Sequence, residues 1–130
     1  MDQYFDKVKA YLIELDYDII SIDEQESIFI VNSTDGGIYN LVIDCEDPIL
    51  IVEQYMFDIN VENVAAYKTL LQMNREIVHG AFVLDETGKK VIFRDTLQLE
   101  NLDLNEIQAT LNSLELLLSE FSAQLVKLAN

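Results

Sequence analysis

The stretch from Leu70 to Leu102 constrains the fold most, because it joins a helix end, a tight hairpin and the approach to a last helix. Its sequence is LLQMNREIVHGAFVLDETGKKVIFRDTLQLENL, in which two short apolar runs flank the turn sequence DETG. Gly88 ends that turn sequence and is able to take the positive φ angle that a hairpin turn requires. We therefore expect a β-hairpin over residues 80–95 that adds to a sheet.

The first half of the chain changes from helical to strand periodicity. Residues 2–16 carry apolar side chains at helical spacing, which predicts an amphipathic helix. Alternating apolar residues then predict an antiparallel meander with one face toward a core. Its four expected strands cover residues 19–22, 27–33, 38–45 and 49–57. Gly36 and Gly37 lie in the second turn, and we expect both to accept positive φ angles.

A second helix is expected between the meander and the hairpin. Asn60 is placed to cap it, and apolar residues at helical spacing extend it from Val61 to about Val78.

A third helix should end the fold. Asp103 and Glu106 have the spacing of a capping box, and the apolar repeat continues to about Leu128. Leu114 and Leu118 lie in the middle of this apolar stripe, so we expect both to be buried and Glu115 to lie on the opposite side.

These elements give the order α-β-β-β-β-α-β-β-α. We expect an α+β fold in which helices pack against a twisted antiparallel sheet, formed by one domain over residues 1–130. A chain of this length is able to bury a substantial core, and its 50% content of hydrophobic residues disfavours disorder.

The charge is strongly negative. Eight basic residues against 24 acidic ones give a formal charge of −16, which disfavours binding to nucleic acid or to an anionic membrane surface. The charge is also uneven, because residues 67–94 carry five basic residues against three acidic ones. This middle part of the chain is therefore the one best suited to meet an acidic neighbour, such as a second copy of the chain.

No pattern of residues indicates catalysis. His79 is the only histidine and Cys45 the only cysteine, and neither lies in a nucleophile motif. Cys45 is expected to be a small buried hydrophobic residue and His79 to be structural or exposed. Glu53 would be a candidate general acid if it were buried, although no second carboxylate can be assigned to it.

No cofactor or metal site is expected either. The chain has no glycine-rich phosphate loop, and the acidic run Asp44, Glu46 and Asp47 lacks the spacing of a calcium loop. The sequence shows neither an apolar run long enough to span a membrane nor a signal-peptide core, and it cannot form an internal disulfide. We therefore expect a cytoplasmic protein.

The chain resembles the YbjN family, a bacterial group that shares the fold of the type III secretion chaperones. The resemblance rests on the order of elements and on Asn74, Arg75, Gly80 and Phe82, followed by the Gly88 turn and the run VIF at residues 91–93. It implies a twisted antiparallel sheet packed by helices, in a protein that forms homodimers. It also implies binding of an extended client segment at the sheet edge and in apolar grooves, and it assigns no catalytic residue.

The resulting hypothesis is a non-enzymatic protein-binding module, a chaperone-like homodimer that holds an extended segment of a client protein. A regulatory adaptor of the YbjN type that binds a folded partner is the alternative, and a small enzyme is the third. The candidate dimer or client surface combines apolar residues of the second helix and the hairpin: Tyr67, Leu70, Leu71, Met73, Phe82 and Phe93.

Overall fold

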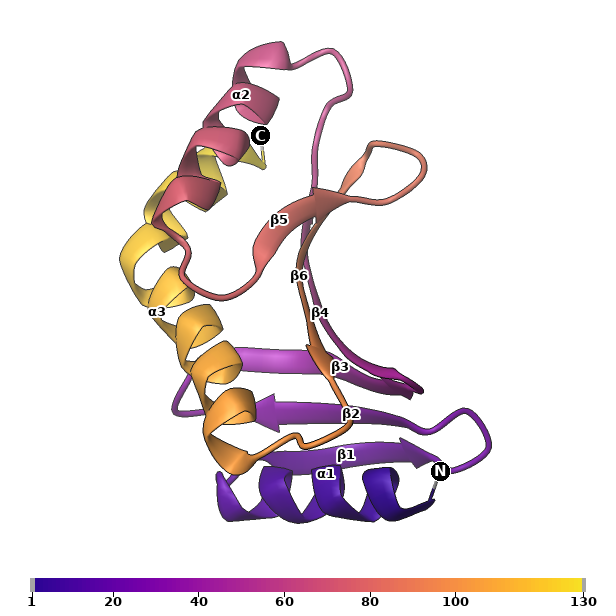
Figure 1. Cartoon of the computed structure of the whole chain (residues 1–130). Coiled ribbons are helices and arrows are strands. Elements are labelled where there is room, and N and C mark those ends of the chain that lie inside the picture. Colours follow the sequence, from indigo (N-terminus) through magenta and orange to yellow (C-terminus); the bar gives the residue numbers. More distant parts are fainter. Residues whose placement is uncertain (1, 130) are drawn as a thin grey trace.

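The computed structural model describes residues 2–129, with side chains from residue 4 onward, and confirms the α+β fold and its order of elements. Three α-helices and one 3-10 helix accompany six strands (Figure 1). The helices are α1 (Asp2–Glu14), α2 (Val64–Met73), η1 (Asn74–Glu76) and α3 (Leu104–Leu128). The strands are β1 (Asp18–Asp23), β2 (Ile28–Ser33), β3 (Ile38–Glu46), β4 (Ile49–Asp58), β5 (Ala81–Leu84) and β6 (Lys90–Gln98).

The six strands form one antiparallel sheet in the order β1-β2-β3-β4-β6-β5. The first four strands follow the chain as a meander, and β6 then pairs along most of β4, from Ile49 opposite Gln98 to Asp58 opposite Lys90. The expected hairpin is present as β5 and β6, and β6 continues beyond its predicted end at residue 95. The short strand β5 is consequently one edge of the sheet and β1 the other.

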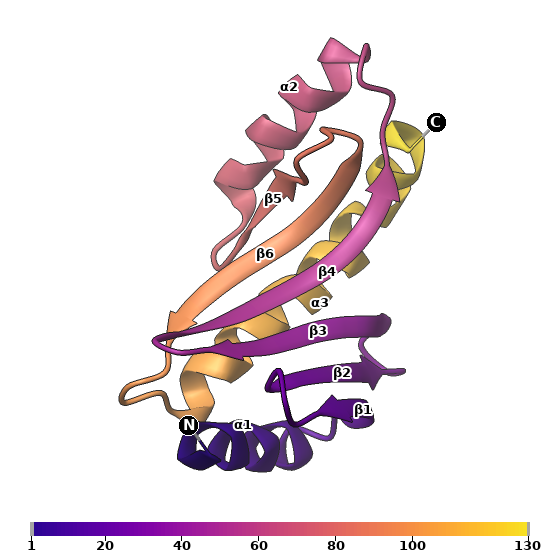
Figure 2. The ribbon, with the colours of Figure 1, turned by 90° about the vertical axis from the view of Figure 1, so that its right-hand side faces the viewer.

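One face of the sheet, here called the inner face, carries the core. Alternate residues of the central strands are buried on it: Phe29, Val31, Leu41, Ile43, Leu50 and Val52. The ring of Phe5 on α1 stacks on Phe29 with centroids 4.3 Å apart. Thr110 on α3 donates a hydrogen bond to Asp95 on β6 over 2.7 Å. In Figure 2, β3, β4 and β6 lie in front of α3, so the opposite face of these strands faces the viewer.

The predicted limits of the second helix were wrong. The helix begins after Asn63, whose side-chain oxygen accepts a hydrogen bond from the N–H of Ala66, and it ends at Met73. Asn60 forms a turn instead, because its side chain accepts from the N–H of Glu62. Residues 74–76 form the 3-10 helix η1, so the helix does not reach Val78.

The capping box of α3 is confirmed, because the side chains of Asp103 and Glu106 each accept a hydrogen bond from the other's N–H. Leu114 is fully buried as predicted, but Leu118 is only partly buried. Glu115 does not lie on a free opposite side, since it accepts a 2.7 Å hydrogen bond from the hydroxyl of buried Tyr17.

The two glycine turns differ from each other. Gly88 has the positive φ expected of it, at 74°. In the β2–β3 turn only Gly37 has a positive φ, at 72°, so the expectation for Gly36 was wrong. The backbone of Gly36 instead lies close to the side chain of Glu115, which approaches the position of a Cβ atom within 2.7 Å.

Candidate protein-binding surface

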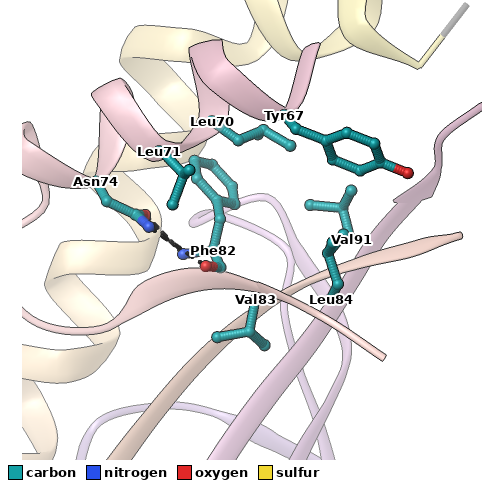
Figure 3. A pocket seen from close by; sticks show the side chains of 8 residues that line it. All are labelled: Tyr67, Leu70, Leu71, Asn74, Phe82, Val83, Leu84 and Val91. Atoms are coloured by element: carbon teal, nitrogen blue, oxygen red, sulfur yellow. Dashed lines mark hydrogen bonds between the residues drawn. The ribbon is translucent and has the colours of Figure 1, made fainter. Parts of the chain in front are cut away.

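An apolar cavity of about 310 Å³ opens between α2 and the β5–β6 hairpin (Figure 3). Its walls come from the helix and from both strands, and they are almost entirely hydrocarbon. The lining residues are Tyr67, Leu70, Leu71, Asn74, Phe82, Val83, Leu84 and Val91.

One side of α2 packs on the core, and its other side is exposed and apolar. Ala66, Leu70 and Met73 are buried and anchor the helix to the core. Leu71 and Val64 are 70% and 73% exposed, although both are large and apolar. Exposed apolar residues of this size beside an apolar cavity are typical of a protein-binding surface.

Two side chains hold α2 over the hairpin. The hydroxyl of Tyr67 donates a 2.9 Å hydrogen bond to the carbonyl of Gly88 in the β5–β6 turn. The amide of Asn74 contacts the main chain of Phe82 twice, accepting from its N–H over 2.8 Å and donating to its carbonyl over 3.3 Å. The Asn74 amide thus occupies the place where a neighbouring strand would pair with Phe82.

The rest of the β5 edge is open. The N–H of Asp85 donates to the carbonyl of Lys90 on β6. Because pairing alternates along an antiparallel strand, Val83 also pairs toward β6, while the main-chain groups of Phe82 and Leu84 point away from the sheet. Asn74 covers those of Phe82, and within residues 2–129 no side chain is hydrogen-bonded to the main chain of Leu84.

Four of the six residues predicted for this surface line the cavity together: Tyr67, Leu70, Leu71 and Phe82. The other two are core residues, since Phe93 is fully buried and Met73 is 7% exposed. The prediction missed Asn74 as a cap on the strand edge, and it missed three further lining residues: Val83, Leu84 and Val91. Alternation along β5 places Leu84 on the same face as Phe82, so that spacing was the available signal for it.

The residues considered for catalysis are not brought together. Cys45 is buried, and the loss of hydration raises the pKa of its thiol to about 12, which makes it a poor nucleophile. His79 is exposed, and its main chain bonds Ser113 on α3. Glu53 is partly exposed and forms an ion pair with Arg94 over 3.0 Å, so it is not a buried acid.

Among residues 2–129 there is no group of three or more His, Cys, Asp or Glu side chains placed to hold a metal ion. Within the same range no helix combines the length and the apolar character that crossing a membrane requires.

Three solved structures illustrate the similarity of the fold. YbjN from E. coli matches with a TM-score of 0.68 at 13% identity, over 92% of each chain. SycH, a type III secretion chaperone from Yersinia pestis solved with a fragment of YscM2, matches with a TM-score of 0.60 at 16% identity, over 96% of this chain and 98% of that one. A chain of the HopA1–SchA chaperone–effector complex matches with a TM-score of 0.61 at 10% identity, over 97% and 92%.

Among curated proteins, none matches this chain. The family model CesT_Tir_1, which describes type III secretion chaperones, matches residues 1–130. With its sheet order and its three helices, the chain therefore belongs to the CesT_Tir_1 family of type III secretion chaperones.

Proposed function

We propose that this protein is a non-enzymatic, cytoplasmic module that works as a homodimer and holds an extended segment of a client protein. The observation that carries the proposal is the apolar cavity between α2 and β5, bordered by exposed Leu71 and by the open edge at Leu84. Membership of the CesT_Tir_1 family supports a protein-binding role, as do the complexes of SycH and SchA with other proteins.

The exposed side of α2, which carries Leu71 and Val64, is the best candidate for contact between two copies. Each copy carries a charge of −16, so two copies repel one another unless they meet where acidic residues are sparse. Residues 67–94, which include most of α2 and all of β5, have a positive balance of two charges. Packing Leu71 and Val64 against a partner would remove large apolar side chains from water.

Light scattering after size exclusion tests the dimer. We expect a mass of about 30 kDa, twice the 14.9 kDa of the chain. Leu71→Asp should give a monomer that remains folded, because this side chain is 70% exposed. Ile13→Asp is the matched control, since Ile13 is an exposed apolar residue on α1, and it should leave the dimer intact. A wild-type mass of 14.9 kDa at every concentration would contradict the dimer.

The client hypothesis has a separate test. A display library of short unstructured segments and a library of folded domains would be selected on the immobilised protein. We expect enrichment from the unstructured library, because an extended segment is able to pair with an open strand edge and insert alternate side chains into apolar pockets. Enrichment from the folded library alone would favour the regulatory adaptor instead.

A further inference from the structure

The sheet has a second apolar surface on the face turned away from the core, here called the aliphatic face. It consists of partly buried residues on three neighbouring strands: Ile28, Ile30, Val42, Ile49 and Ile51. None of the five packs against the buried core, and Figure 2 shows no helix in front of β3 and β4. These side chains therefore cover one another on an open sheet surface.

One carboxylate lies in the middle of the aliphatic face. Asp44 on β3 is in register with Ile28 on one side and with Ile51 on the other. Side chains directly opposite on neighbouring strands have Cβ atoms about 5 Å apart, so both isoleucines contact the space around the Asp44 carboxylate. Its Oδ1 atom is buried and has no hydrogen-bond partner among the described residues.

The surroundings of Asp44 disfavour its charge. Loss of hydration is the largest effect that raises the pKa of this carboxyl, followed by the charge of Glu46, a side-chain hydrogen bond with Glu46, and then the charges of Glu53 and Glu26. The two basic residues that point from β6 to this face are already engaged. Arg94 pairs with Glu53, while Lys90 pairs with Asp58 and lies over the ring of Tyr55. A carboxylate oxygen buried without a donor is unfavourable, and a cation supplied by a partner would relieve it.

These features define the chemistry of the occupant. Lys and Arg have aliphatic stems that pack on apolar surfaces while the charged head reaches a polar group. A second copy of the chain does not fit, because its aliphatic face would bring acidic residues against acidic residues. We propose that the aliphatic face binds an extended client segment that turns aliphatic residues and Lys or Arg to the same side, two positions apart, with one cationic head donating to Asp44 between Ile28 and Ile51. This inference rests on the proposed client-holding function and names the class of segment and its surface.

Binding of four labelled synthetic peptides, measured by fluorescence anisotropy, tests the inference. The first carries Ile and Lys or Arg in turn at every second position, with Ser between them, so that both kinds of side chain lie on one side of the extended peptide. The second replaces the basic residues by Gln and the third replaces them by Glu. The fourth keeps the basic residues and replaces Ile by Ser. We expect the first peptide to bind about tenfold more tightly than the second and the fourth, because it alone satisfies both the carboxylate and the isoleucines. The third peptide should not bind.

Three variants locate the site. Asp44→Asn should weaken binding of the first peptide about tenfold and leave the second unchanged. Ile51→Thr, which keeps a β-branched side chain on the strand, should weaken both. Asp35→Asn removes one negative charge from the exposed β2–β3 turn and should change neither.

Three other outcomes would overturn the inference. Equal binding of the first and fourth peptides would show attraction by charge alone and would overturn the inference. Binding of the first peptide that is insensitive to Asp44→Asn and Ile51→Thr, but lost in Leu71→Asp, would mean that the client binds the α2–β5 surface or requires the dimer. That outcome overturns the inference and leaves the client-holding function standing. Absence of binding by all four peptides also overturns it, while selection from the unstructured library still judges the wider function.

Discussion

Gly80 shows how a single residue links the candidate surface to the core. It precedes β5 with a φ of 90°, and a Cβ atom added there would collide with the ring of Phe93 and lie 3.2 Å from the carbonyl oxygen of Arg94. Because Phe93 is fully buried, its ring has no free space to enter. Gly80→Ala should therefore lower the free energy of unfolding by about 2–5 kcal/mol, from backbone strain and overpacking together.

Gly88→Ala is the matched control. Gly88 also has a positive φ, at 74°, but a Cβ atom there would meet nothing within 4 Å. Only backbone strain of about 1–2 kcal/mol remains. Urea unfolding of the two variants compares them, and equal midpoints would contradict the role assigned to Phe93.

Asp44 is predicted to lower the stability of the protein without its client. The pKa of its carboxyl is raised in the folded state, so folding favours the neutral form. The resulting penalty is absent below the ordinary pKa of 3.8 and grows as the pH rises through the raised pKa. Asp44→Asn should therefore be more stable than the wild type at about pH 7, with the difference vanishing at about pH 3.

The measurement is urea unfolding of wild type, Asp44→Asn and Asp35→Asn at both pH values. Asp35 is exposed in a turn, so its variant controls for the general loss of one negative charge. If Asp44→Asn were less stable than the wild type at neutral pH, the carboxylate would have a donor in the folded protein. Residues at functional sites often lower the stability of the folded protein because they are retained for binding.

At the scale of single elements, α3 is a structural part of the fold. Leu114 is fully buried, and its replacement by Ala should cost about 2–5 kcal/mol and lower the melting temperature by many degrees. Leu118 is only partly buried, so Leu118→Ala should cost less than Leu114→Ala. Gln124→Ala, at an exposed position of the same helix, is the control that should leave the thermal melt unchanged.

Glu115→Ala belongs with the damaging variants of α3. Its removal takes away the carboxylate that accepts the 2.7 Å hydrogen bond from the hydroxyl of buried Tyr17, which costs about 1–3 kcal/mol. A melt of Leu114→Ala identical to that of Gln124→Ala would mean that α3 does not belong to the core.

The sequence predicted the presence and order of helices and strands better than it predicted where each element ends and which of its side chains are buried. Every helix and strand of the expected order is present, because apolar periodicity and turn residues act locally. The second helix stops at Met73, and the side chain of the next residue, Asn74, binds the main chain of Phe82, a contact that periodicity does not reveal. The orientation of Glu115 depends on Tyr17, almost a hundred positions away along the chain.

The candidate surface was also predicted only as far as local spacing allows. Four of its six predicted residues meet at one cavity, since helical and strand spacing place them on one side of their elements. Phe93 was assigned to a surface because hydrophobicity does not distinguish a core residue from an interface residue. The aliphatic face was not predicted, because strands that are apolar on both sides give no periodic signal of which side faces the core.

For the whole molecule, salt should act in opposite directions on the two proposed contacts. Two chains of charge −16 repel each other, and added salt screens this repulsion, so the dimer should tighten. The basic client peptide is attracted to acidic residues, so its binding should weaken as salt rises. Sedimentation and anisotropy at about 20 mM and about 500 mM salt measure both trends, and trends of the same sign would contradict this division of charge between the two surfaces.

The route of the chain between β4 and β6 has a consequence for motion. Residues 59–89 lie between the end of β4 at Asp58 and the start of β6 at Lys90, which is paired with Asp58 in the β4–β6 register and bonded to it over 3.3 Å. The segment that contains α2 and β5 is therefore a loop closed at its neck, and we expect its local opening to leave β4 and β6 paired. Amide hydrogens of β5 should then exchange with solvent sooner than those of β3, and each such opening turns β6 into a bare edge of nine residues that a second chain can occupy.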